Sequence, residues 1–140
     1  MARSTLLMIE DEILLCELFA DYVVTIPDVE FLGCENDGAS GVAKALEAKP
    51  DIVVLDMRLP KVNGIEALHQ LRAALPTTKL IVFTGTLKEE TLRLAKQEGA
   101  DAFVEKAQGL GELKKAILAV LAGDRFISPG VADILRDFRA

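Results

Sequence analysis

Four short apolar runs of the chain each end in a group that can do chemistry. The first run ends in the pair Glu10 and Asp11. The next three end in Asp56, Thr84 and Lys106, in that order. Carboxylates can bind a cation, a hydroxyl can donate a hydrogen bond, and an ammonium can neutralise phosphoryl oxygens. The set therefore predicts a site for a divalent metal ion and a phosphoryl group.

The apolar runs are typical of buried strands in a parallel sheet. Strands are expected at residues 5–10, 30–35, 51–55, 79–83 and 102–104, and helices at 12–25, 39–48, 64–74, 88–98 and 111–121. This alternation predicts an α/β fold of the flavodoxin-like, doubly wound type, with a five-stranded parallel sheet in the order 2-1-3-4-5 and five helices. Strands one and three are then neighbours at the switch point, where ligands bind, which places Glu10 and Asp11 beside Asp56.

Three converging carboxylates predict a bound cation. At about 4 Å, each pair repels by about 1 kcal/mol in water and by about 4 kcal/mol at an effective dielectric of 20. Oxygen ligands at a phosphate-handling site favour Mg²⁺ over Ca²⁺. The carboxylate of Asp56 can also attack phosphorus and form an aspartyl-phosphate, while Lys106 and the Thr84 hydroxyl stabilise the transferring oxygens.

The chain resembles the receiver domain of bacterial two-component response regulators over residues 4 to about 123. The resemblance rests on segments 7–12, 51–60 with Gly64, 83–85 and 103–106. It implies that Asp56 accepts a phosphoryl group from the phosphohistidine of a sensor histidine kinase. It also implies that Asp11, Asp56 and the backbone carbonyl of Arg58 bind Mg²⁺ directly, with Glu10 acting through water.

The same resemblance implies a signalling switch. Thr84 and Lys106 would hold the phosphoryl oxygens, and Phe103 would turn inward when Thr84 moves toward the phosphate. Phosphorylation would shift the population between two arrangements, and partners would read the face formed by helix 88–98, strand 102–104 and helix 111–121. Self-catalysed phosphoryl transfer and dephosphorylation are the only catalysis expected.

Three positions depart from the usual receiver pattern. Gly85 after Thr84 replaces a common Ala, which is expected to make that loop more mobile. Glu10 stands where many receivers have Asp, and its longer side chain still reaches a metal-bound water. Ala107 follows Lys106 where many receivers have a proline with a cis peptide bond. Because a cis bond without proline costs about 3 kcal/mol, a trans bond is expected here.

The C-terminal part of the chain narrows the resemblance to one subfamily of response regulators. Residues 122–129 look like the segment that joins receivers to a LuxR-type helix-turn-helix output, so we divide the chain into a receiver domain (1–123) and a linker with a short amphipathic helix (124–140). Ser128 is expected to be the N-cap of that helix and Pro129 its first residue. Its apolar face would consist of Val131, Ile134, Leu135 and Phe138. Two alternatives stay open: a part of a transcription regulator that binds DNA only through a domain absent here, or a stand-alone receiver that acts through protein contacts or in a phosphorelay.

The first helix has a wide apolar arc that needs a cover. The arc consists of Leu14, Leu15, Leu18, Phe19, Tyr22 and Val23. Either the C-terminal helix lies on it or a second protomer does, and we hold homodimerisation as a hypothesis.

The bulk composition excludes several classes. The net charge is −6, without a run of Lys or Arg, which argues against a nucleic-acid-binding surface. Apolar stretches are too short for a membrane helix and no signal peptide is evident, so a cytoplasmic location is expected. Cys16 and Cys34 are expected to be buried thiols in a reducing compartment, and His69 to lie on the surface.

Four other interpretations of the site fit less well. A phosphohydrolase of the haloacid-dehalogenase type needs Asp-x-Asp, but Arg58 occupies the second position and cannot be the acid. A cobalamin site would need His at that same position. A flavodoxin-like nucleotide binder would need a Gly-rich loop after strand one. This chain has Glu10 and Asp11 there, which would repel a nucleotide phosphate. A receiver that is never phosphorylated would not need this complete set of acidic groups and Lys106.

Overall fold

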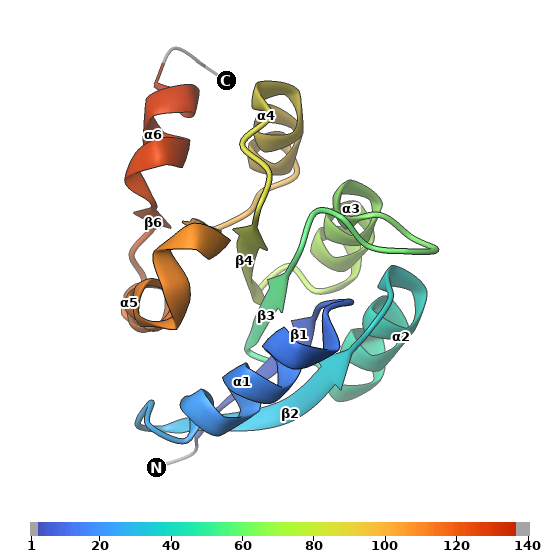
Figure 1. The fold of residues 1–140 in the computed structure, drawn as a ribbon. Coiled ribbons are helices and arrows are strands. Elements are labelled where there is room, and N and C mark those ends of the chain that lie inside the picture. Colours follow the sequence, from blue (N-terminus) through green and yellow to red (C-terminus); the bar gives the residue numbers. More distant parts are fainter. Residues whose placement is uncertain (1–2, 137–140) are drawn as a thin grey trace.

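The computed structural model describes residues 3–136 and is built on a six-stranded parallel sheet (Figure 1). The strands are β1 (Ser4–Ile9), β2 (Val29–Glu35), β3 (Ile52–Leu55), β4 (Lys79–Thr84), β5 (Ala102–Glu105) and β6 (Phe126–Ile127). Their order, β2-β1-β3-β4-β5-β6, confirms the predicted order of the first five. The short strand β6, which the sequence pattern did not predict, extends the sheet beside β5.

Helices cover both faces of the sheet. They are α1 (Ile13–Val23), α2 (Gly38–Ala48), α3 (Gly64–Ala74), α4 (Glu89–Gln97), α5 (Gly109–Leu121) and α6 (Pro129–Leu135), with a 3-10 turn at Lys106–Gln108. One core cluster joins the sheet to α1 and α5, and the other joins it to α2, α3, α4 and α6. Within residues 3–136 there is no helix with the length and apolar character needed to cross a bilayer.

The central strands owe their position to continuous apolar sequence. All four residues of β3, Ile52–Leu55, are fully buried, and alternate ones enter opposite core clusters. A strand covered on both faces has no solvent side, so it has no polar alternation. Polar residues begin directly after the strand with Asp56, at the edge where β1 also ends.

The C-terminal helix α6 packs on α4 and β5, not on α1 (Figure 1). Of the two alternatives for the apolar arc of α1, cover by the C-terminal helix is therefore wrong for the described residues, because α1 lies on the opposite face of the sheet. Val131 and Leu135 are buried in the same cluster as Phe103. Phe138, the last residue of the predicted apolar face, lies outside the described residues.

Ser128 precedes Pro129 at the start of α6, but its side chain does not cap the helix. Its Oγ instead accepts a hydrogen bond from the backbone N–H of Glu105 at 3.1 Å, and its own N–H donates to the carbonyl of Phe103 at 2.8 Å. Because β6 pairs with β5, Ser128 lies beside Glu105, and its hydroxyl bonds to the backbone of the sheet instead of capping the helix.

The two cysteines form a disulfide, Cys16–Cys34, between α1 and β2. The expectation of separate buried thiols is wrong for this structure. The first turns of α1 and the end of β2 both lie next to the carboxyl end of β1, which brings the two Cα atoms to 6.1 Å from each other. A separation of 18 residues, with no CxxC pattern, does not reveal that proximity.

Candidate functional site

Two glycines shape the loop that carries Asp56 from β3 to α3. A Cβ on Gly64 would collide with the Cα of Met57 and would lie 2.6 Å from the carbonyl oxygen of Asp56. A Cβ on Gly38, at the start of α2, would collide with the carbonyl of Val62. Both obstacles are backbone atoms, which cannot rotate away as a side chain can. The loop therefore folds back tightly on its own start, and this holds Asp56 at the edge of the sheet.

Three carboxylates converge at this edge. Glu10, Asp11 and Asp56 each offer one oxygen, and these oxygens all lie within 4.8 Å of one another. Glu10 and Asp56 are buried and Asp11 is exposed, so the cluster opens to solvent on one side. A cleft of about 300 Å³ lies there, lined by Asp11, Glu12, Asp56, Arg58, Gly85 and Lys106. The oxygen-only donor set fits a hard divalent cation such as Mg²⁺.

Lys106 is the cation that the chain itself supplies. Its Nζ lies 3.0 Å from Glu10 Oε1, 2.9 Å from Asp56 Oδ2 and 2.8 Å from Glu12 Oε1. The predicted meeting of Asp56 and Lys106 is confirmed in this geometry. Glu12 was not among the predicted site residues, although it is the third acid of the run that contains Glu10 and Asp11.

Burial and the hydrogen bonds of Lys106 shift the pKa values of Glu10, Glu12 and Lys106. Burial raises the pKa of Glu10 to about 7, although hydrogen bonds from Lys106 and from the N–H of Glu12 lower it. Burial alone would lower the pKa of Lys106, but hydrogen bonds to Glu12, Asp56 and Glu10 raise it above its usual value. The hydrogen bond from Lys106 also lowers the pKa of Glu12. Lys106 is thus held in its charged form, in contact with Glu10, Glu12 and Asp56.

The remaining predicted residues surround the cluster at different depths. Thr84 ends β4, is fully buried and does not line the cleft; its Oγ1 accepts a hydrogen bond from the N–H of Thr86 at 3.1 Å. Phe103 is buried against α6. Arg58 lies at the cleft, and its N–H donates to Asp56 Oδ1 at 3.3 Å. The metal-binding role of the Arg58 carbonyl stays a prediction, whereas the trans bond after Lys106 is confirmed.

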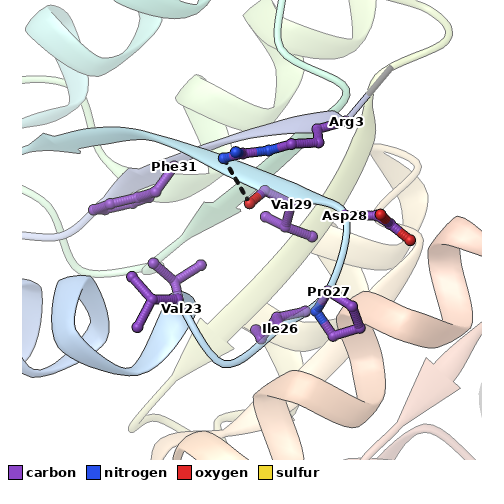
Figure 2. A pocket seen from close by; sticks show the side chains of 8 residues that line it. Arg3, Val23, Ile26, Pro27, Asp28, Val29 and Phe31 are labelled. Atoms are coloured by element: carbon purple, nitrogen blue, oxygen red, sulfur yellow. Dashed lines mark hydrogen bonds between the residues drawn. The ribbon is translucent and has the colours of Figure 1, made fainter. Parts of the chain in front are cut away.

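A second hollow, of about 330 Å³, lies at the far end of α1 around the start of β2 (Figure 2). Figure 2 shows Arg3 donating a hydrogen bond to the carbonyl of Val29, at 3.3 Å. The other walls of this hollow are largely apolar, and Asp28 is the one carboxylate among the residues that line it. Without converging acidic or nucleophilic groups, this hollow is not a candidate for phosphoryl chemistry.

The single histidine lies apart from the cleft. His69 is exposed on α3, and its Nδ1 lies 2.9 Å from a carboxylate oxygen of Glu98. This confirms the predicted surface position.

Comparisons with known proteins agree with this geometry. Residues 6–118 match the response regulator receiver domain family. The chain is 31% identical over 129 residues to the response regulator GacA of Pseudomonas viridiflava, covering 92% of this chain and 60% of that protein. It is 29% identical over 132 residues to the nitrate/nitrite response regulator protein NarL of Escherichia coli K12, covering 94% and 61%. The chain thus spans about 60% of the length of these relatives.

Solved structures give the same picture. A LuxR-family two-component response regulator from Aurantimonas sp. SI85-9A1 superimposes with a TM-score of 0.89 at 27% identity, over 97% of both chains. The isolated receiver domain of RcsB from Salmonella enterica serovar Typhimurium superimposes with a TM-score of 0.87 at 18% identity, which shows a shared fold alone.

Proposed function

The chain belongs to the response regulator receiver domain family, and we propose that it is a phosphorylation-controlled switch whose Asp56 accepts a phosphoryl group from a sensor histidine kinase. The observation that supports this most is the position of the Asp56 carboxylate, in contact with Lys106 and within the acidic cluster. A nucleophilic carboxylate, an ammonium for the phosphoryl oxygens and a set of cation ligands then occupy one open cleft.

The chemistry follows from the charges of these groups. An Asp56 oxygen attacks phosphorus, an O–P bond forms, and the P–N bond to the donor histidine breaks with the electron pair leaving on nitrogen. The attacking carboxylate and the phosphoryl group are both anionic, so they repel each other until cations lie nearby. Lys106 supplies one such charge. Glu10, Asp11 and Asp56 would hold Mg²⁺, which when bound supplies further positive charge beside the phosphoryl oxygens.

The proposed metal site predicts a specific loss of affinity. An Asp11→Asn variant should bind Mg²⁺ about tenfold or more weakly, because it removes one anionic oxygen from the cluster without altering the fold. Isothermal titration with Mg²⁺ measures this directly. The matched control is Asp21→Asn, an exposed aspartate in α1, which should leave the affinity unchanged. Equal Mg²⁺ affinities for Asp11→Asn and the wild type would exclude Asp11 as a ligand.

Removing the metal tests the function as a whole. Incubation with acetyl phosphate and Mg²⁺ should add the mass of one phosphoryl group to the intact protein, and EDTA should prevent that addition. Uptake that persists in EDTA would contradict a metal-dependent transfer.

Lys106 is expected to act mainly on the transferring group. A Lys106→Gln variant should take up the phosphoryl group about 10²–10³-fold more slowly, which is the usual cost of losing one electrostatic contact to developing charge. Mg²⁺ binding should survive, because no carboxylate is removed. The initial rate of uptake from acetyl phosphate at saturating Mg²⁺ is the measurement, with the exposed Lys115→Gln as the control. An unchanged rate in Lys106→Gln would remove Lys106 from the mechanism.

The proposed output is a change of surface rather than a second reaction. Thr84 and Phe103 would couple the phosphoryl group to the face formed by α4, β5 and α5, because Phe103 lies in β5 and is buried in the same cluster as Leu92 of α4 and Val131 of α6. The likeness to a LuxR-family response regulator supports transcription regulation through a DNA-binding domain outside this chain. The exposed Leu14 and Leu18 on α1 support a homodimer. The alternative is a stand-alone receiver in a cytoplasmic phosphorelay.

A further inference from the structure

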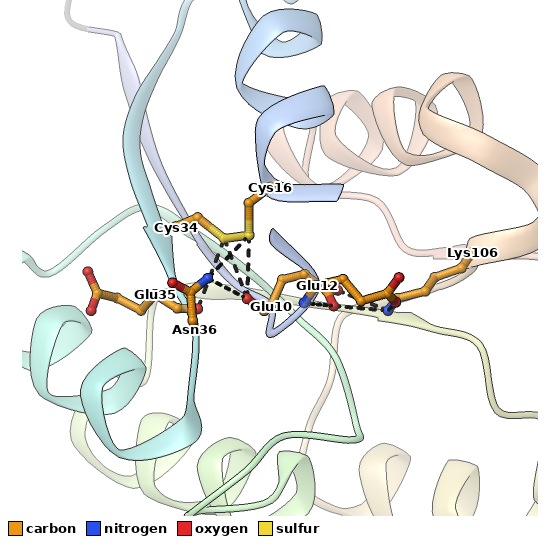
Figure 3. Close-up of a disulfide and its surroundings, with 7 residues drawn as sticks. All are labelled: Glu10, Glu12, Cys16, Cys34, Glu35, Asn36 and Lys106. Atoms are coloured by element: carbon orange, nitrogen blue, oxygen red, sulfur yellow. Dashed lines mark hydrogen bonds and ion pairs between the residues drawn. A yellow bond between two sulfur atoms is a disulfide. The ribbon is translucent and has the colours of Figure 1, made fainter. Parts of the chain in front are cut away.

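The disulfide lies next to the backbone of Glu10, one of the three residues of the acidic cluster (Figure 3). The Sγ atoms of Cys16 and Cys34 lie 3.4 Å and 3.8 Å from the backbone carbonyl oxygen of Glu10. The Nδ2 of Asn36 donates a hydrogen bond to the same oxygen at 2.9 Å. The carboxylate of Glu10 points the other way, toward Lys106. One residue thus contacts the sulfur pair through its backbone and the acidic cluster through its side chain.

We propose that Cys16 and Cys34 are a reversible redox pair that sets the affinity of the acidic cluster for a divalent cation. The inference rests on the proposed function only in that the cluster binds such a cation. It is independent of the kinase and of the output.

The oxidation requires a disulfide as the co-reactant, and a low-molecular-weight disulfide of the glutathione type is sufficient. The sulfur of Cys34, which is half-buried, attacks one sulfur of that disulfide and releases the first small thiol. The buried Cys16 sulfur then attacks the Cys34 side of the mixed disulfide and releases the second thiol. The two protein thiol protons leave with the two small thiols, so two protein thiols and one small disulfide become one protein disulfide and two small thiols. In a reducing compartment the pair returns to thiols by the reverse exchange.

The bond fixes the loop that carries the metal ligands. Residues 10–12 connect β1 to α1, and Glu10 N–H donates to the carbonyl of Glu35 at the end of β2, at 2.9 Å. The disulfide ties α1 to β2, so it anchors the far end of that loop to the same strand. Fewer loop conformations must then be lost when a cation orders Glu10 and Asp11.

Reduction changes the polar contacts as well. In the disulfide neither sulfur carries a proton, and Asn36 is the side-chain donor to the Glu10 carbonyl. After reduction each S–H can donate to that oxygen, and α1 is free to shift relative to β2. With α1 free to shift, the loop of residues 10–12 has more conformations to lose when a cation binds. The oxidised form therefore binds the cation more tightly.

The test uses the whole chain and Mg²⁺ alone. The protein is oxidised with glutathione disulfide or reduced with dithiothreitol, its thiol content is counted by alkylation and intact mass, and Mg²⁺ is titrated by calorimetry. We expect about fivefold tighter binding by the oxidised form, at the lower end of usual coupling between sites. Because coupling is reciprocal, Mg²⁺ should lower the reduction potential of the pair by about 20 mV, which is the same fivefold factor at 29.6 mV per tenfold.

Cysteine variants separate the bond from other effects of the oxidant. Cys34→Ser should bind Mg²⁺ as the reduced wild type does, before and after treatment with glutathione disulfide, and Cys16→Ala serves the same purpose if Cys34→Ser does not fold. Equal Mg²⁺ affinity in the oxidised and reduced forms overturns the redox proposal and leaves the proposed function standing. Failure of the two cysteines to become protected from alkylation overturns it too. Absence of Mg²⁺ binding in both forms overturns the metal site itself and, with it, the inference.

Discussion

An Asp56→Asn variant is expected to take up no phosphoryl group from acetyl phosphate in the presence of Mg²⁺, where the wild type takes up one. The amide has nearly the same shape as the carboxylate, but it lacks the anionic oxygen that attacks phosphorus. It also removes one partner of Lys106, which lies 2.9 Å from Asp56 Oδ2. Intact-protein mass over a time course measures the uptake in both proteins.

The control is Asp51→Asn at the opposite end of the same strand. Asp51 accepts a hydrogen bond from the N–H of Thr5 at 2.8 Å, which an asparagine oxygen can also accept. Its uptake of the phosphoryl group should equal that of the wild type. Continued uptake by Asp56→Asn, at the wild-type rate, would show that another residue is the acceptor.

A Gly64→Ala variant is expected to lose about 3 kcal/mol of unfolding free energy, at the upper end of the usual cost of overpacking. The new methyl group would lie on the backbone of Met57 and 2.6 Å from the carbonyl oxygen of Asp56, so the loop must open to accept it. Opening the loop moves Asp56 away from the other carboxylates. The variant should therefore also take up the phosphoryl group more slowly, even at a temperature where it is folded.

Chemical denaturation measures the loss, and Gly111→Ala is the matched control. Gly111 lies on α5, and a Cβ there would have nothing within 4 Å, so alanine should stabilise the helix by about 0.5–1 kcal/mol. Equal stabilities for Gly64→Ala and the wild type would show that the β3–α3 loop relaxes around the methyl group.

The sheet order and most of the site could be predicted because they depend on local pattern. The strand β3 is a continuous apolar run, and the alternation with helices leaves few arrangements for a parallel sheet. Asp56, Glu10 and Asp11 directly follow such runs, so the order of the strands also places the carboxylates. Lys106 follows β5 in the same way.

Other features depend on contacts that no local pattern encodes. The strand β6 has two residues, Phe126–Ile127, too few for a visible alternation. The Cys16–Cys34 pair requires the end of β2 and the first turns of α1 to meet, and Ser128 bonds to the sheet because β6 lies beside β5. The contact of Glu12 with Lys106 depends on how the loop after β1 turns.

The most direct measurement is the position of the phosphoryl group on the chain. After incubation with acetyl phosphate and Mg²⁺, borohydride reduces an acyl phosphate to an alcohol, and peptide fragmentation then identifies the carboxyl residue that became homoserine. We predict homoserine at position 56 alone, formed only when Mg²⁺ was present. Homoserine at Asp11 or Asp51, or its absence from a protein that gained phosphoryl mass, would contradict Asp56 as the acceptor.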